Sequence, residues 1–140
     1  MPLRFIKTFI LMLLLSDTAY AAGPNVREGR WQTIVRVQVG GITLPAPFKT
    51  EKCITTGDLV PNSVDAGSRC TIEDIDTAGN DVTWTVNCAD VQGSLRGHGV
   101  ITYAGDTLEG AMEMVARDTG GAVVSNSLYE MRGERKGDCD

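Results

Sequence analysis

The chain has 140 residues, with 13 basic and 18 acidic side chains and a formal net charge of −5. An acidic chain lacks the basic face that the phosphates of nucleic acids require, and it is not drawn to anionic lipid. The length fits one domain. Composition therefore excludes nucleic acid as a partner and leaves the strand pattern and the cysteines as the informative features.

Residues 1–21 have the three parts of a cleavable export signal. Two basic residues open the segment, an apolar run follows over 9–15, and Ala19-Tyr20-Ala21 forms a small-x-small cleavage site. The apolar run is shorter than the roughly 20 residues that cross a bilayer. We expect cleavage after Ala21 and a mature chain over 22–140, with no membrane span, in the periplasm or outside the cell.

The first strand is predicted over residues 29–39, where apolar and polar side chains alternate. Its apolar face carries Trp31, Val35, Val37 and Val39. Paired glycines and two prolines then interrupt the chain, and a second strand is predicted over 48–54. Residues 55–62 are compatible with one helical turn, and the stretch up to Ser68 is typical of a loop.

Residues 69–76 and 81–89 predict a β-hairpin around Gly79-Asn80, because both turn residues tolerate a positive φ. If the loop is odd-numbered and centred on Gly79, Cys70 faces Cys88 across the two strands. A slip of one residue would place the two thiols on opposite faces. The same register aligns the apolar side chains of the hairpin, which are Ile72, Val82, Trp84 and Val86.

Three further strands are predicted over 92–103, 107–117 and 122–132, followed by a polar tail over 133–140. The first of them is rich in glycine, which permits bends or close packing. Short turns between consecutive strands favour a meander. The predicted fold is therefore all-β: an antiparallel meander of about seven strands, as a curled sheet or a small barrel, in one domain over 22–140.

Four cysteines in an exported chain predict two disulfides. The hairpin register pairs Cys70 with Cys88, and Cys53 with Cys139 follows by elimination. Zinc sites and redox pairs use closely spaced cysteines, whereas these four are widely spaced and His98 is the only histidine. We therefore interpret all four as structural.

Candidate chemical residues are few. His98 lies between two glycines and could act as an acid or base near neutral pH, but no nucleophile motif accompanies it. Asp74, Asp76 and Asp81 lie near one end of the hairpin and could hold calcium, although their spacing fits no EF-hand. We therefore predict no catalytic residue, no metal and no cofactor, and we do not expect an enzyme.

Aromatic and methionine side chains on the predicted strands suggest an apolar ligand face, since methionine adapts to irregular ligands. These residues are Trp31, Trp84, Met112, Met114 and Met131. The simpler interpretation is that they fill the core.

Five segments of the chain resemble the bacterial Domain of Unknown Function 3617 family. They are residues 24–31 (PNVREGRW), 53–55 (CIT), 84–88 (WTVNC), 103–110 (YAGDTLEG) and 137–139 (GDC). They occur in the family's order and span nearly the whole mature chain. The resemblance implies a small exported bacterial protein with no established activity, and it supplies no catalytic residues.

The hypothesis that fits these features best is a non-catalytic binding module for a small apolar ligand or a protein partner. The alternative is a structural or assembly protein that pairs with another chain through an exposed edge strand.

Overall fold

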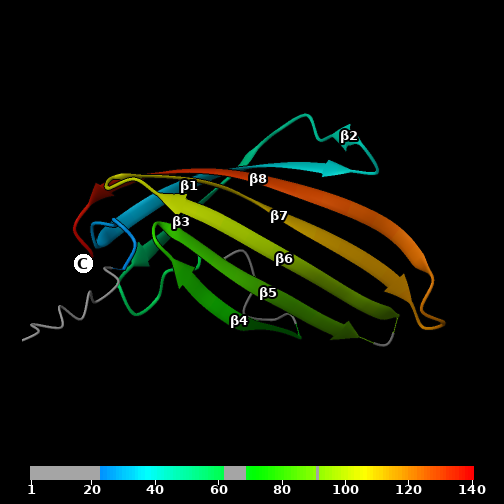
Figure 1. The fold of residues 1–140 in the computed structure, drawn as a ribbon. Helices are drawn as coiled ribbons and strands as arrows, with labels where there is room; N and C mark the ends of the chain where they lie inside the picture. The colour runs from blue at the N-terminus through cyan, green and yellow to red at the C-terminus, as the bar shows by residue number, and fades with distance from the viewer. Residues whose placement is uncertain (1–22, 62–68, 91) are drawn as a thin grey trace, which may run out of the picture.

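The computed structural model describes residues 23–61, 69–90 and 92–140, so the predicted export signal over 1–21 lies outside the described residues. The described part of the chain forms eight strands of one sheet and no helix (Figure 1). The strands are β1 (Gly29–Val39), β2 (Ile42–Thr43), β3 (Phe48–Ile54), β4 (Cys70–Ala78), β5 (Asp81–Asp90), β6 (Gly93–Tyr103), β7 (Thr107–Asp118) and β8 (Val123–Gly137). The all-β prediction is confirmed, with one strand more than expected.

The sheet is antiparallel, in the order β2-β1-β8-β7-β6-β5-β4, and β3 pairs with β1 on the same side as β2. Strands β4 to β8 follow one another as the predicted meander, and the first strand then pairs with the last. The sheet curls but does not close, since β4 forms one edge and β2 with β3 forms the other (Figure 1). The curled sheet is therefore the correct version of the prediction, and the closed barrel is not.

One face of the curled sheet, which we call the inner face, holds the core. Trp31 and Val35 of β1 point to it, as the alternation predicts. The Trp31 and Tyr103 rings meet edge to face with centroids 5.7 Å apart. Trp84 packs against β6, where a Cβ added at Gly99 would come within 2.3 Å of its ring. Of the glycines predicted to allow close packing in β6, Gly99 makes room for Trp84 and Gly97 for the Met114 side chain.

Residues 55–61, which follow β3 and which we call the crossing segment, cover one end of the inner face. Val60 and Pro61 of this segment are buried, and the Tyr103 hydroxyl donates a hydrogen bond of 2.6 Å to the Leu59 carbonyl oxygen. The helical turn predicted over 55–62 is wrong for its described part, where Thr55 and Asp58 instead close a tight turn by two backbone hydrogen bonds.

The β4–β5 hairpin has the predicted register at its open end, where Cys70 pairs with Cys88. The odd-numbered loop is wrong, because Ala78 pairs with Asp81 across a two-residue turn. A bulge between Glu73 and Asp76 adds one residue to β4 and reconciles the two registers. Within this bulge Asp74 has a φ of 52°, a left-handed conformation that aspartate tolerates better than most residues.

Both predicted disulfides, Cys70–Cys88 and Cys53–Cys139, are confirmed. The tail differs from the prediction, because β8 continues to Gly137 through residues that we assigned to a polar tail. Gly133 and Glu134 pair with both β1 and β7, whereas Arg135 and Gly137 pair with β1 alone, and the outward positions stay exposed. Polar and small residues therefore form a strand here because a neighbouring strand pairs with them.

Candidate functional site

The five residues of the predicted ligand face all lie in the core. Trp31 and Trp84 are 1% exposed, and Met112, Met114 and Met131 are at most 5% exposed. They belong to a single packed cluster together with Ile101, Leu108 and the residues around them. An apolar ligand could reach these side chains only by displacing that packing. Their role as a ligand face stays a prediction.

The opposite, outer face of the sheet carries a run of hollows along β8 and β7. Two hollows of about 520 and 510 Å³ adjoin each other and share Ile34, Glu109 and Arg132. A third hollow of about 390 Å³ continues along the same strands past Leu128 to Asn126. We call this surface the outer groove. From Glu134 to Asn126 it follows nine residues of β8, whose eight steps span about 26 Å of extended chain.

The centre of the outer groove is apolar. Ile34 of β1, Ala111 of β7 and Val100 of β6 all point outward here, and Ile34 and Val100 are each more than a third exposed. Ala111 pairs with Glu130 on one side and with Val100 on the other, so its small side chain leaves a gap between longer neighbours. This gap forms the floor of the groove.

The rim of the outer groove is charged. Arg132 and Glu109 lie opposite each other and form an ion pair of 3.6 Å in which both side chains are mostly exposed. Arg36 and Glu130 pair across β1 and β8 on the same face, and neither takes part in an ion pair with another described residue. The rim therefore offers one cation and one anion to a bound molecule.

Glycines on the inner side of β7 and β8 allow close packing beneath the outer groove. A Cβ added at Gly110 would come within 2.3 Å of the Val100 carbonyl oxygen, and one at Gly133 would meet the Leu108 side chain at 2.8 Å. Larger residues at these two positions would therefore displace the neighbouring strands or the core side chains below the groove.

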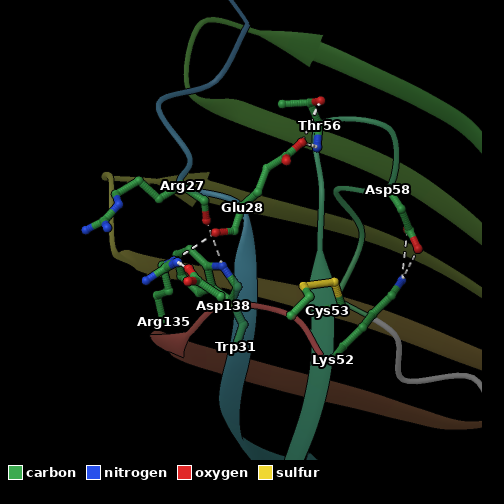
Figure 2. The surroundings of a disulfide bond; sticks show 10 residues. Arg27, Glu28, Trp31, Lys52, Cys53, Thr56, Asp58, Arg135 and Asp138 are labelled. Atoms are coloured by element: carbon green, nitrogen blue, oxygen red, sulfur yellow. Dashed lines mark hydrogen bonds and ion pairs between the residues drawn. A yellow bond between two sulfur atoms is a disulfide. The ribbon is translucent and has the colours of Figure 1, made fainter.

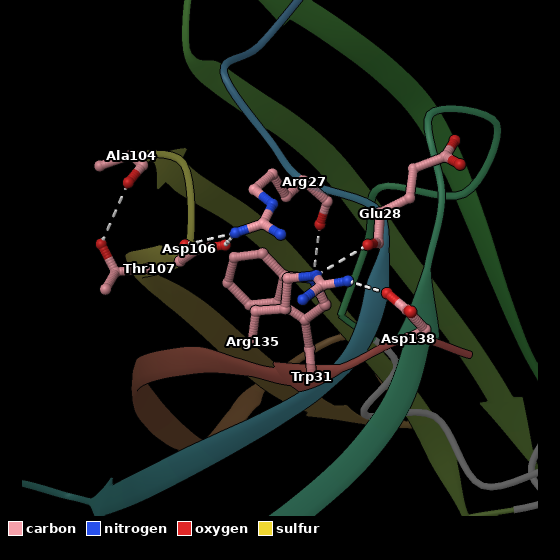
Figure 3. Close-up of polar contacts among 8 residues, drawn as sticks. All are labelled: Arg27, Glu28, Trp31, Ala104, Asp106, Thr107, Arg135 and Asp138. Atoms are coloured by element: carbon pink, nitrogen blue, oxygen red, sulfur yellow. Dashed lines mark hydrogen bonds and ion pairs between the residues drawn. The ribbon is translucent and has the colours of Figure 1, made fainter. Parts of the chain in front are cut away.

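A polar network joins the segment before β1 to the end of β8 at one end of the sheet. The Arg135 Nε donates a hydrogen bond of 2.8 Å to the Glu28 carbonyl oxygen, and its guanidinium pairs with Asp138 (Figure 3). The Trp31 Nε1 donates to the Arg27 carbonyl oxygen at 3.0 Å. A Cβ added at Gly29 would come within 2.5 Å of the Arg135 Nε, so only glycine leaves room for this guanidinium.

The same network reaches the turn after β3. The Glu28 carboxylate accepts hydrogen bonds of 2.9 Å from both the backbone nitrogen and the hydroxyl of Thr56 (Figure 2). These two bonds, the backbone one first, lower the pKa of Glu28. The Lys52 ammonium donates to Asp58 at 2.8 Å and to the Val60 carbonyl oxygen at 3.0 Å, which ties the crossing segment to β3. The network anchors the N-terminal segment and the crossing segment.

None of the remaining chemical candidates is among the residues that line the hollows of the outer groove. His98 is exposed on β6, opposite Glu113 of β7 and Thr85 of β5. Of the three aspartates considered for calcium, Asp81 accepts a hydrogen bond from Thr102 and Asp76 from the backbone of Thr77. Within 23–61, 69–90 and 92–140 no group of three or more potential ligands from histidine, cysteine, aspartate and glutamate is suited to a metal ion.

The sequence reasoning missed the outer groove, although a signal was available. The outward positions of a half-buried strand are normally polar, yet Ile34 stands between Gln32 and Arg36, and Ala111 stands between Glu109 and Glu113. These two exceptions to the pattern lie in the groove. An apolar or small residue on the polar side of a strand therefore marked this surface.

Comparisons with known proteins identify a family and nothing further. A family model described as protein of unknown function (DUF3617) matches residues 26–139. No curated protein and no solved structure matches the chain. Within the described residues, no helix has the length and apolar character needed to cross a membrane.

Proposed function

The chain belongs to the DUF3617 family of proteins of unknown function, and we propose that it is an exported, non-catalytic binding module whose partner is an extended protein segment held in the outer groove. The observation that carries this proposal is the row of hollows along β8 and β7. Its length of about 26 Å suits roughly eight residues of extended polypeptide.

Export is supported by the cysteines and by the start of the sequence. All four cysteines are paired, and structural disulfides persist in oxidising compartments such as the periplasm. The basic, apolar and small-residue parts of residues 1–21 are those of a cleavable signal. Together they favour the periplasm or the exterior of the cell.

A protein segment suits the outer groove better than a small apolar ligand does. Protein interfaces combine an apolar centre with a polar rim, which is the arrangement of Ile34 and Ala111 within the charged rim. Small-molecule sites are concave and mostly apolar, and they enclose most of the ligand. The apolar side chains of this protein that could do so are packed in the core.

Capture from a periplasmic extract tests the proposal. The wild-type domain is immobilised beside Ala111→Trp, which fills the floor of the groove, and Thr85→Trp, which adds the same ring to the outer face of β5. We expect the wild type and Thr85→Trp to retain the same protein and Ala111→Trp to lose at least 90% of it. Equal capture by all three proteins would contradict the proposal, as would saturable binding of a fluorescent fatty acid by delipidated protein.

A further inference from the structure

The two disulfides lie in different surroundings. Cys53 and Cys139 are both exposed, whereas Cys70 and Cys88 are half-buried and pack against the core cluster. Thiol–disulfide exchange needs in-line approach of an attacking thiolate to a sulfur atom, so its rate depends on access. An external thiol therefore reaches one of the two bonds more readily than the other.

The exposed disulfide also makes a different kind of connection. Cys70 and Cys88 lie on neighbouring strands that a ladder of hydrogen bonds already joins. Cys53 of β3 and Gly137 of β8 lie on either side of Arg30 in β1, and Cys139 follows two residues after Gly137. The tail therefore crosses β1 and ties β8 to the edge strand β3 (Figure 2).

Few other contacts hold this tail. Beyond β8, Asp138 forms an ion pair with the Arg135 guanidinium, and the Asp138 side chain is 93% exposed. Exposed ion pairs stabilise a structure only slightly. Once the bond between Cys53 and Cys139 is open, residues 138–140 are free to leave the sheet, while the pairing of β3 with β1 stays in place.

We propose that Cys53–Cys139 is a site of thiol–disulfide exchange with an exported dithiol protein, and that Cys70–Cys88 is a permanent cross-link. A thiolate of the dithiol attacks one sulfur, the bond between the two sulfurs breaks, and the released cysteine takes a proton. The second thiol of the partner then attacks the mixed disulfide. The partner leaves oxidised as its own disulfide, and two electrons and two protons have reduced Cys53 and Cys139 to thiols.

Graded reduction of the exported protein purified from periplasm tests this proposal. Native protein is treated with increasing dithiothreitol, or with a thioredoxin-fold dithiol protein, then alkylated and mapped by mass spectrometry. We expect Cys53 and Cys139 to be alkylated at least tenfold faster than Cys70 and Cys88. We expect the near-ultraviolet circular dichroism of the buried Trp31 and Trp84 to persist while this happens.

Reduction in urea is the control, because unfolding removes the difference in access. The two disulfides should then react at rates within about threefold of each other. Native rates that are equal, or faster at Cys70 and Cys88, would overturn the proposal. Loss of the tryptophan signal in step with alkylation of Cys53 would also overturn it, because the exchange would then follow unfolding.

Discussion

Tyr103 connects three parts of the molecule through one side chain. Its ring packs edge to face on Trp31 of β1, and its hydroxyl donates to the Leu59 carbonyl oxygen of the crossing segment. Burial, and then the charge of Asp58, raises the pKa of this phenol above its ordinary value of 10.0. Tyr103 thus stays protonated in the folded state at a pH where the unfolded chain would ionise.

A pH dependence follows from this pKa, with a definite sign. Above about pH 10 the unfolded chain loses the Tyr103 proton and the folded chain keeps it, so the free energy of unfolding falls as pH rises. Tyr103→Phe removes the hydrogen bond and should lower stability at pH 7 by about 1 kcal/mol. Wild type should lose up to about 1.4 kcal/mol of unfolding free energy per pH unit above pH 10 because of Tyr103, and Tyr103→Phe should lack this loss.

Urea unfolding of wild type and Tyr103→Phe between pH 7 and 11 measures both effects. Parallel stability curves over the whole range would show that Tyr103 is not the residue responsible.

The contacts of Tyr103 also show a limit of sequence reasoning. Tyr103 lies in a predicted strand and in the family segment 103–110, but its partner is 44 positions away in a loop. No local pattern points to that carbonyl oxygen.

At the scale of strands, the β4–β5 hairpin shows both the strength and the limit of pattern reading. The spacing of Cys70 and Cys88 about the turn was sufficient to predict the disulfide. The disulfide register needs paired numbers that sum to 158, whereas a two-residue turn at Gly79-Asn80 gives 159. The bulge resolves this conflict by placing two residues of β4 opposite Trp84, and no local pattern in the sequence marks that position.

The family resemblance located structural elements and only part of the outer groove, to which segment 103–110 contributes Glu109. Four of its five segments meet at the end of the sheet where Arg135, Trp31 and Cys53 lie. They supply the anchored N-terminal segment, the end of β3, a turn and the tail. Ile34 and Ala111, which form the centre of the outer groove, lie outside all five segments.

Both edges of the sheet carry features that hinder pairing with another chain. Pro45 and Pro47 interrupt the edge made by β2 and β3, and proline cannot donate a ladder hydrogen bond. The β4 edge is broken by the bulge and lined by Glu73, Asp74 and Asp76. These features disfavour the alternative hypothesis of assembly through an edge strand.

Removal of the two prolines tests that interpretation. The exported domain should be monomeric at about 100 μM by light scattering. The double variant Pro45→Thr and Pro47→Thr should self-associate, since an uninterrupted edge with Ile42 and Phe48 exposed is a template for pairing. A wild type that already forms dimers, with a monomeric proline variant, would favour assembly instead.

For the whole molecule, the two cross-links contribute unequally to stability. The chain-entropy treatment gives about 4.5 kcal/mol for Cys53–Cys139, which closes 86 positions, and about 3 kcal/mol for Cys70–Cys88, which closes 18. A domain of this size has on the order of 5–15 kcal/mol in total. Each bond is therefore a large fraction of the stability.

Double alanine variants compare them directly. Cys53→Ala with Cys139→Ala should lower the free energy of unfolding in water, extrapolated from urea curves, more than Cys70→Ala with Cys88→Ala does. The order should hold although the first pair is exposed and the second packs against the core. A larger loss for the hairpin pair would mean that local packing outweighs loop closure.

The overall topology was predictable only in part. The meander of β4 to β8 follows from short turns between alternating segments, and β1 and β3 have the predicted bounds. Pairing of β1 with β8 joins residues about a hundred positions apart. Such non-local pairing leaves no periodicity in the sequence, and neither does the open edge that distinguishes a curled sheet from a barrel.

The central claim is that the outer face binds and the inner face is core, and site-specific photocrosslinking in the periplasm tests it most directly. A photocrosslinking amino acid in place of Ala111 should form a covalent adduct with one protein. The same group in place of Thr85, on the outer face of β5, should form none. Adducts of equal yield at both positions, or an adduct only when the group replaces the buried Met114, would contradict the claim.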